Sequence, residues 1–390
     1  MQQIVFIETL YVRFIKDKVI MKMIFLIIGL FCSLKISAKN VGGEIKRSGN
    51  RTAIKHKTIY KQDKDIELGN TPIEEVYSVK LEERAKKGNA AAQFALANIY
   101  LLGNGIKADE ELAKKYLIKS AEQGYTIAQY TLGIAYLNGN IDGEPQYDMA
   151  HKYLVLAADK KYVNAMFFVG VNYLLGRGVT QDTSKALYYI ENAAQENDVS
   201  ALNLLGSMYR DGKYKQKDLH KAFNCFVKSA NQGNANAQSY LGKCYMDGLG
   251  TEKDALKAFD WLKKSANNGS ANGYYWLAVC YRDGCGVAID MQEYFKNMMI
   301  SANLGDPAAK SNVGLCYIEG DGVEKDEKEA VRWFVDAANN GDVLGQYCLG
   351  CCFLYGTGIE KDLQTALVWL KKAADKGFQQ AINTLNQIKE

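Results

Sequence analysis

The chain has 390 residues, only three of them proline, and a formal net charge of +4. So few prolines leave no proline-rich linker between domains, and the composition therefore favours one continuous structure. The basic residues concentrate before about residue 70, outside the part expected to fold. This argues against nucleic-acid binding, because a nucleic-acid-binding protein carries its positive charge on the face that docks.

Residues 1–38 have the features of an export signal. The stretch "MKMIFLIIGLFCSLKISAK" starts at Met21, continues as an apolar run from Met23 to Leu34, and offers Ala38 as a cleavage position. The run is short for a membrane span, so we expect the protein to be exported, either periplasmic or secreted. Residues 1–20 are an unusual preface to such a signal, which leads to the hypothesis that translation starts at Met21. The alternative is membrane association through an uncleaved N-terminal anchor. Residues 39–70 are predicted to form a basic, flexible linker.

Residues 71–390 repeat themselves with a period of 36 residues and one interval of 37. Each period is marked by a residue that ends an alanine-rich segment. These landmarks are Gly88, Gly124, Lys161, Asn197, Gly233, Gly269, Gly305, Gly341 and Gly377. Such a period is the signature of a solenoid. A leading half-repeat, starting with Thr71 and Pro72, and a trailing one are expected to cap the two ends.

Two helical patterns occur in each repeat. Counted from the landmark, the first helix has small residues at positions 4 and 9 and an aromatic residue at position 12, as in Ala237, Gly242 and Tyr245. The second helix has an alanine followed three residues later by a large side chain, as in Ala258 and Trp261. Small residues let helices approach closely, and the aromatic residue fills the space between them. The predicted fold is an all-α, α/α superhelical solenoid of about eight helix-turn-helix repeats.

The turn between the two helices is rich in glycine, as in Gly320 and Gly322. Glycine permits positive φ there, and the aspartate that follows, such as Asp326, is expected to cap the second helix. Glu293 and Glu329 are expected to complete capping boxes in their repeats. The turn has neither the Walker spacing nor the full ligand pattern of a calcium loop. We therefore predict that it is structural.

The stretch "YLGKCYMDGLGTEKDALKAFDWLKKSANNG" and its copies resemble the Sel1-like repeat family, a relative of the tetratricopeptide repeat. The resemblance covers about residues 73–388 and departs in repeat 6, where Tyr294 and Asn297 replace an alanine and a large apolar residue. It implies a non-catalytic adaptor for a partner protein or peptide. A cysteine-rich secreted branch of the family is associated with penicillin binding or β-lactamase activity, so such a β-lactamase or peptidoglycan-related hydrolase is the alternative. That branch pairs cysteines where this chain has alanines.

The nine cysteines and three histidines suggest no catalytic or metal site. Cys244, Cys280, Cys316 and Cys352 share one position in successive repeats, about 8 to 10 Å apart if the helices pack normally. This separation is too long for disulfides between them, so we predict that they are core residues. No nucleophile has a base in sequence context. We therefore expect no catalytic residues, no metal, no cofactor and no small-molecule substrate.

A partner is expected to bind along positions 7, 10 and 14 of the first helices, which face away from the helix core. Large apolar side chains at position 7 are candidate anchors, and acids at position 14 could pair with basic groups of the partner. Some of these side chains could instead pack against neighbouring repeats. The predicted partner-binding residues are Phe168, Val171, Leu204, Asp211, Tyr240, Lys243, Asp247, Trp276 and Asp283.

Overall fold

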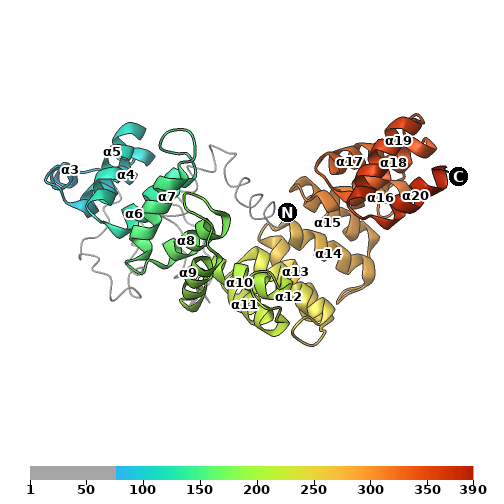
Figure 1. The fold of residues 1–390 in the computed structure, drawn as a ribbon, viewed down its shortest axis with the longest axis horizontal. Coiled ribbons are helices and arrows are strands. Elements are labelled where there is room, and N and C mark those ends of the chain that lie inside the picture. Colours follow the sequence, from blue (N-terminus) through green and yellow to red (C-terminus); the bar gives the residue numbers. More distant parts are fainter. Residues whose placement is uncertain (1–75, 390) are drawn as a thin grey trace, which may run out of the picture. The chain divides into compact units, whose positions relative to one another are not determined.

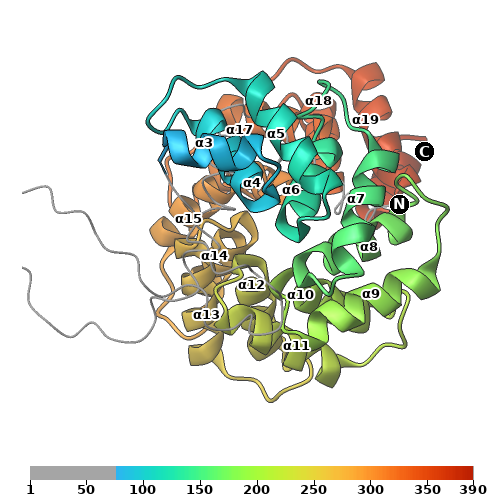
Figure 2. The same cartoon turned by 90° about the vertical axis from the view of Figure 1, so that its left-hand side faces the viewer.

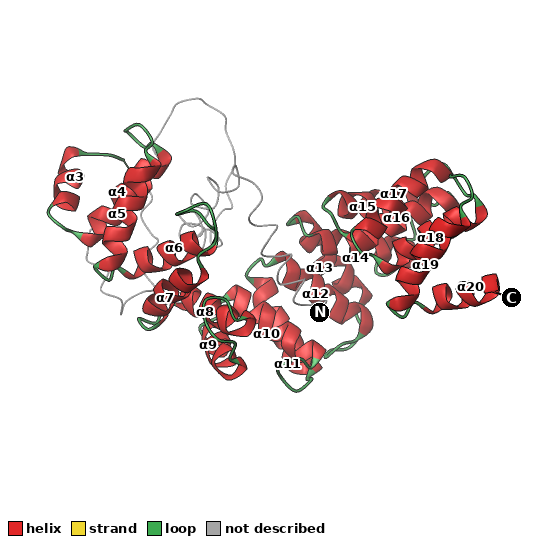
Figure 3. Ribbon diagram, turned by 45° about the horizontal axis from the view of Figure 1, so that its top comes forward, coloured by secondary structure: helices red, strands yellow, loops and turns green. Residues whose placement is uncertain are grey.

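The computed structural model describes residues 76–389, which form helices joined by turns and contain no strand (Figure 3). The helices are α3 Val79–Lys86, α4 Ala90–Leu102, α5 Glu110–Glu122, α6 Thr126–Leu137, α7 Tyr147–Ala158, α8 Val163–Leu175, α9 Thr183–Gln195, α10 Val199–Asp211, α11 Leu219–Asn231, α12 Ala235–Asp247, α13 Ala255–Asn267, α14 Ala271–Asp283, α15 Met291–Asn303, α16 Pro307–Glu319, α17 Glu327–Asn339, α18 Val343–Tyr355, α19 Leu363–Asp375 and α20 Gln379–Lys389. The all-α class and the two helices per repeat are confirmed.

Two compact units divide the chain, Met1–Tyr189 and Ile190–Glu390, with the boundary inside α9. Within the first unit, each helix from α3 to α8 packs on the next one, and within the second unit the same holds from α10 to α20 (Figures 1 and 2). First helices of consecutive repeats are also in contact; for example, α12 contacts α14. Each element therefore contacts its near neighbours in sequence, as in a solenoid.

The predicted signal, residues 1–38, and the predicted linker, residues 39–70, lie outside the described residues. Thr71 and Pro72 lie outside them as well. The first described helix, α3, begins at Val79, and the Ser78 hydroxyl accepts a hydrogen bond from the Leu81 amide at 3.1 Å. Among the helices of residues 76–389, none is both long enough and apolar enough to cross a membrane.

Close approach of the paired helices explains the glycines at position 9. A Cβ atom on Gly242 would lie 2.6 Å from Leu262 Cγ, and one on Gly314 would lie 2.5 Å from Phe334 Cε1. Both large side chains are fully buried. The glycines therefore lower helix propensity but allow the close approach that the sequence predicts. The side chains packed against them come from the second helices and are not the predicted aromatic residues at position 12.

The interhelical turns lie against the preceding repeat. Gly322 has a φ of 71°, and a Cβ atom there would lie 1.9 Å from the Met291 carbonyl oxygen at the start of α15. Both the left-handed conformation and the close contact exclude a larger residue. The predicted structural role of the glycine-rich turn is confirmed.

Aspartates cap the second helices as predicted, but the capping boxes do not form. Asp326 Oδ1 accepts hydrogen bonds from the Lys328 and Glu329 amides, both at 3.0 Å. The Asp326 amide donates to the Tyr317 carbonyl at 3.0 Å, whereas the Glu329 side chain pairs with Arg332 at 2.8 Å. The same replacement occurs in repeat 6, where Glu293 pairs with Lys296 at 2.7 Å. The prediction was wrong because the first helix already supplies the acceptor for the capping amide.

A row of serine hydroxyls joins the second helices to the first helices of the same repeats. Ser265 Oγ donates to the Ala235 carbonyl at 2.6 Å, and Ser229 Oγ donates to the Val199 carbonyl at 2.8 Å. Ser120 and Ser301 make the equivalent bonds at 2.7 and 2.8 Å. These carbonyls belong to the first residues of the first helices and also accept the backbone bonds of their own helices, so the bonds satisfy the buried serine hydroxyls and link the two helices.

Candidate partner-binding surface

The predicted binding residues fall into both units. Phe168 and Val171 lie on α8 in the first unit, where Val171 is buried at 4% exposure and belongs to the core. The half-buried Phe168 ring packs 6.1 Å from the Tyr130 ring, centroid to centroid. The other seven residues lie on α10, α12 and α14 of the second unit. Leu204 is half-buried on α10.

Tyr240 is a half-buried ring held between two repeats. One face stacks on Phe226 of α11, with the ring centroids 5.1 Å apart. The guanidinium carbon of Arg210, on α10, lies 4.4 Å from the Tyr240 ring centroid. Arg210 is held in turn by a two-pronged hydrogen bond to Asp211, at 2.7 and 2.9 Å. Tyr240 is therefore fixed in orientation by a cation from the preceding first helix.

Trp276 repeats this arrangement one repeat later. Lys243 Nζ lies 3.9 Å from the Trp276 ring centroid, and the same ammonium group pairs with Asp247 at 2.6 Å. The Tyr275 ring packs against Trp276 edge to face, with centroids 5.1 Å apart. In both repeats an acid of the first helix holds a cation, and that cation covers the aromatic ring of the next first helix.

The third step of the pattern uses an aromatic residue from a second helix. Arg282 forms a two-pronged hydrogen bond to Asp283 at 2.7 and 3.0 Å, and its guanidinium carbon lies 5.8 Å from the Tyr294 ring centroid. Position 7 of the following repeat is Asn312, whose Oδ1 accepts a hydrogen bond from Tyr294 Oη at 3.4 Å. Tyr294, which departs from the repeat pattern, therefore lies beside position 7 of the following repeat.

We call Arg210, Tyr240, Lys243, Trp276 and Arg282, with the three acids that hold the cations, the cation–aromatic stripe. Its acids do not form a free acidic surface, because each pairs with a cation of the chain itself. The hydrogen bond from Arg282 lowers the pKa of Asp283. The arginines were missed in the sequence, although the tripeptide Arg-Asp-Gly at the end of two first helices, residues 210–212 and 282–284, marks both.

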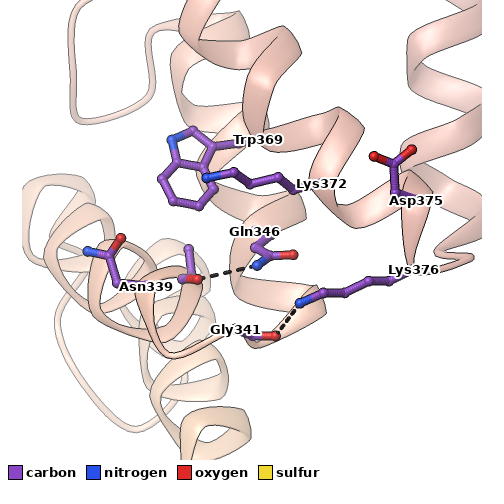
Figure 4. Close-up of a pocket in the computed structure, with 8 residues that line it drawn as sticks. Asn339, Gly341, Gln346, Trp369, Lys372, Asp375 and Lys376 are labelled. Carbon is purple, nitrogen blue, oxygen red and sulfur yellow. Dashed lines mark hydrogen bonds between the residues drawn. The ribbon is translucent and has the colours of Figure 1, made fainter. Parts of the chain in front are cut away.

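A shallow hollow of about 430 Å³ lies between α17, α18 and α19 (Figure 4). Lys372 Nζ sits 3.9 Å from the Trp369 ring centroid, and Lys376 Nζ donates to the Gly341 carbonyl at 2.8 Å. Gln346 Nε2 donates to the Ala338 carbonyl at 3.3 Å. The bonds of Gln346 and Lys376 join neighbouring repeats, so the hollow is a seam between repeats and lacks the apolar enclosure of a ligand pocket.

Catalytic and metal-binding side chains are scattered in the described part of the chain. Between residues 76 and 389, no three His, Cys, Asp or Glu side chains lie together in a way that would hold a metal ion. His151 is buried, which lowers its pKa, and its ring packs edge to face on Tyr173 at 5.0 Å. His220 is exposed. Cys244, Cys280, Cys316 and Cys352, at position 11 of their repeats, are buried core residues, as predicted, and their thiols are free in this structure.

A model of the Sel1 repeat matches residues 90–125, 126–162, 163–198, 199–234, 235–270, 307–342 and 343–378. The chain belongs to the Sel1 repeat family. Sel1 repeat proteins generally act as protein-interaction scaffolds. Between residues 90 and 378, the interval without a match is 271–306, which is repeat 6 with its unusual Tyr294 and Asn297. That repeat still forms two helices of full length, α14 and α15.

Solved structures of other Sel1 repeat proteins are similar to this chain. One is c5321, a protective antigen of uropathogenic Escherichia coli, with 32% identity and a TM-score of 0.62 over 82% of this chain and 67% of that chain. Another is a Sel1 repeat protein from Oxalobacter formigenes, with 30% identity and a TM-score of 0.57 over 79% of this chain and 90% of that chain. A comparison with curated proteins gave no match. These neighbours do not favour the hydrolase alternative.

Proposed function

We propose that this Sel1 repeat protein is a non-catalytic scaffold that binds a protein or peptide along the cation–aromatic stripe of its second unit. The observation that carries the proposal is the repeated arrangement of Tyr240 and Trp276, half-buried rings each oriented by a cation. Tyrosine, tryptophan and arginine are the residues that most often dominate binding energy at protein interfaces. Their fixed orientation lowers the entropy cost of binding.

The stripe favours a partner segment with both apolar and charged side chains. An apolar side chain of the partner would pack on the exposed part of each half-buried ring. A basic group of the partner would compete with Lys243 for Asp247, and an acidic group would compete with Asp247 for Lys243. Such exchange of surface ion pairs changes total energy little, so the rings supply affinity and the charges set register.

Affinity capture with full-length protein tests the proposal. The native cell envelope and candidate host lysates are passed over the protein and over a Tyr240→Ala, Trp276→Ala variant, and bound proteins are compared by mass spectrometry. We expect a partner that the variant loses. Because Tyr240 stacks on Phe226, a second variant, Lys243→Gln, perturbs the stripe without removing a core contact.

A matched control removes aromatic rings that lie elsewhere. Tyr188 and Tyr355 are 63% and 60% exposed, and a Tyr188→Ala, Tyr355→Ala variant should retain the partner. The proposal fails if both double variants capture the same proteins as the natural chain. A circular-dichroism melt of every variant separates loss of binding from loss of fold.

We also propose that the protein is exported, on the sequence features of residues 1–38. The expected mature N-terminus follows Ala38, and mass spectrometry of protein isolated from the native cell identifies it. Retention of residues 21–38 in membrane fractions would support the anchor instead. Recovery of the same residues on soluble protein would overturn export.

A further inference from the structure

Cys280 and Cys285 are two cysteines at the end of α14. Gly284 has a left-handed φ of 71° and ends the helix, and its amide donates to the Cys280 carbonyl. The Cys285 amide donates to the same carbonyl at 3.0 Å. This is the six-residue hydrogen bond of a Schellman motif, in which the side chains of the first and sixth residues commonly touch.

The side chains of the two cysteines lie together as the backbone motif implies. Cys280 is fully buried, and the half-buried Cys285 packs against the hydrophobic cluster that contains Cys280. Burial raises the pKa of the Cys280 thiol, and the charge and hydrogen bonding of the Cys285 thiol raise it further. The two thiols are therefore neighbours inside one repeat.

The backbone motif occurs in other repeats of the second unit, but the thiol pair does not. The equivalent sixth-residue hydrogen bonds are 2.9 Å for Cys244 and Leu249, 3.1 Å for Cys316 and Asp321, and 3.1 Å for Cys352 and Thr357. In each of these repeats the sixth residue has no thiol, so the buried cysteine has no partner at that position for a disulfide. Repeat 6 has the same backbone hydrogen bond as these repeats and differs from them in having a cysteine, Cys285, as the sixth residue.

We propose that Cys280 and Cys285 are a modification site that closes to a disulfide within repeat 6 when a low-molecular-weight disulfide, such as oxidised glutathione, is present. The accessible Cys285 thiolate attacks the disulfide of the oxidant, which forms a mixed disulfide and releases one thiolate. Cys280 then loses its proton and attacks the Cys285 sulfur, and the mixed disulfide breaks to release the second thiol. Two protein thiols are oxidised, and one small disulfide is reduced to two thiols.

Closure would fasten the turn of repeat 6 to its first helix. That turn already lies against the preceding repeat, because a Cβ atom on Gly286 would be 2.2 Å from the Ala255 carbonyl oxygen. The pair also flanks Arg282 and Asp283 of the cation–aromatic stripe. The disulfide would therefore lie at the contact between repeats 5 and 6.

A non-reducing tryptic map of the folded, full-length protein tests the proposal. Trypsin cleaves after Arg282, so Cys280 lies in residues 265–282 and Cys285 in residues 283–296, each as the sole cysteine of its peptide. After incubation with oxidised glutathione, acid quench and alkylation, we expect the two peptides to be linked and to separate on reduction. The link must be absent in Cys285→Ser. Three outcomes would overturn the inference. Cys285 remains a free thiol that can be alkylated, it stops at the mixed disulfide with glutathione, or it forms a disulfide with a cysteine other than Cys280.

Leu249→Cys is the matched control, because it places a second thiol at the same turn position opposite Cys244. If backbone geometry governs closure, this variant gains a second disulfide, within the tryptic peptide of residues 244–253. That peptide would then be lighter by two hydrogen atoms, and neither of its cysteines would be alkylated. Closure of the engineered pair without closure of the natural pair would overturn the inference. The half-buried Cys225 and Cys351 report non-specific oxidation in the same map.

Discussion

Two residues that follow the ends of second helices have a left-handed backbone conformation, which the other repeats adopt with glycine at the same position. Lys161 and Asn197 both have a φ of 61° at the landmark position. A left-handed residue other than glycine costs about 1 to 2 kcal/mol, and asparagine tolerates this conformation better than lysine does. We therefore expect Lys161→Gly to stabilise the protein by up to about 1 kcal/mol and Asn197→Gly to stabilise it less. Chemical denaturation of both variants measures this order, and a larger gain at Asn197 would contradict it.

Buried serine hydroxyls also contribute at the scale of single residues. Ser265 is fully buried, and its hydroxyl donates to the Ala235 carbonyl. Ser265→Ala removes this bond between the two helices, while the Ala235 carbonyl keeps the backbone hydrogen bond of its own helix. The substitution should cost about 0.5 to 1.5 kcal/mol. Ser207→Ala is the control, because Ser207 Oγ bonds to the Asn203 carbonyl within its own helix at 3.1 Å and its loss should cost little. Equal losses in the free energy of unfolding for the two variants would show that the bond between helices stabilises the protein no more than the bond within a helix.

Pairs of helices are held at a separation that depends on one small residue. Gly242→Ala would place a methyl group 2.6 Å from Leu262 Cγ. Overpacking of this kind costs about 1 to 3 kcal/mol and offsets the roughly 1 kcal/mol that alanine adds to helix propensity. We expect net destabilisation, measured as a lower midpoint of urea unfolding.

Repeat 6 supplies a natural compensation for that substitution. Ala278 and Met298 occupy the positions of Gly242 and Leu262, and both are fully buried. Methionine is flexible and fills irregular spaces, so Leu262→Met should recover most of the stability lost in Gly242→Ala. If the double variant is no more stable than the single one, contact with Leu262 is not what requires the glycine.

Stability in the whole molecule should be transmitted only between neighbouring repeats. The terminal helix α20 packs on α19 and covers a cluster that includes Leu370 and Tyr347. Deletion of residues 379–390 should remove hydrogen-exchange protection from α18 and α19 and leave α4 to α7 unchanged, because contacts in a solenoid are local. A uniform loss of protection along the chain would contradict this expectation. A Gln379→Ala variant, which changes an exposed residue of α20, is the control.

The sequence by itself determined the repeat period, the two helices of each repeat, the glycine turns and the aspartate caps. These features depend on interactions within a few residues or on a pattern that recurs at a fixed spacing, so one chain is enough to reveal them. The capping boxes failed because the competing acceptor, the Tyr317 carbonyl in repeat 7, comes from the other helix. A capping-box pattern read from four adjacent residues does not reveal that hydrogen bond to the other helix.

Only the tertiary structure decided the arrangement of the candidate site. It showed that Val171 is buried, that Arg210 and Lys243 cover rings of the next repeat, and that Tyr294 bonds to Asn312. It also brought Cys280 and Cys285 together. The burial of Val171 and the contacts of the rings depend on the separation of packed helices and on side-chain rotamers, which the repeat pattern does not fix. The cysteine pair depends on the backbone conformation at the end of α14.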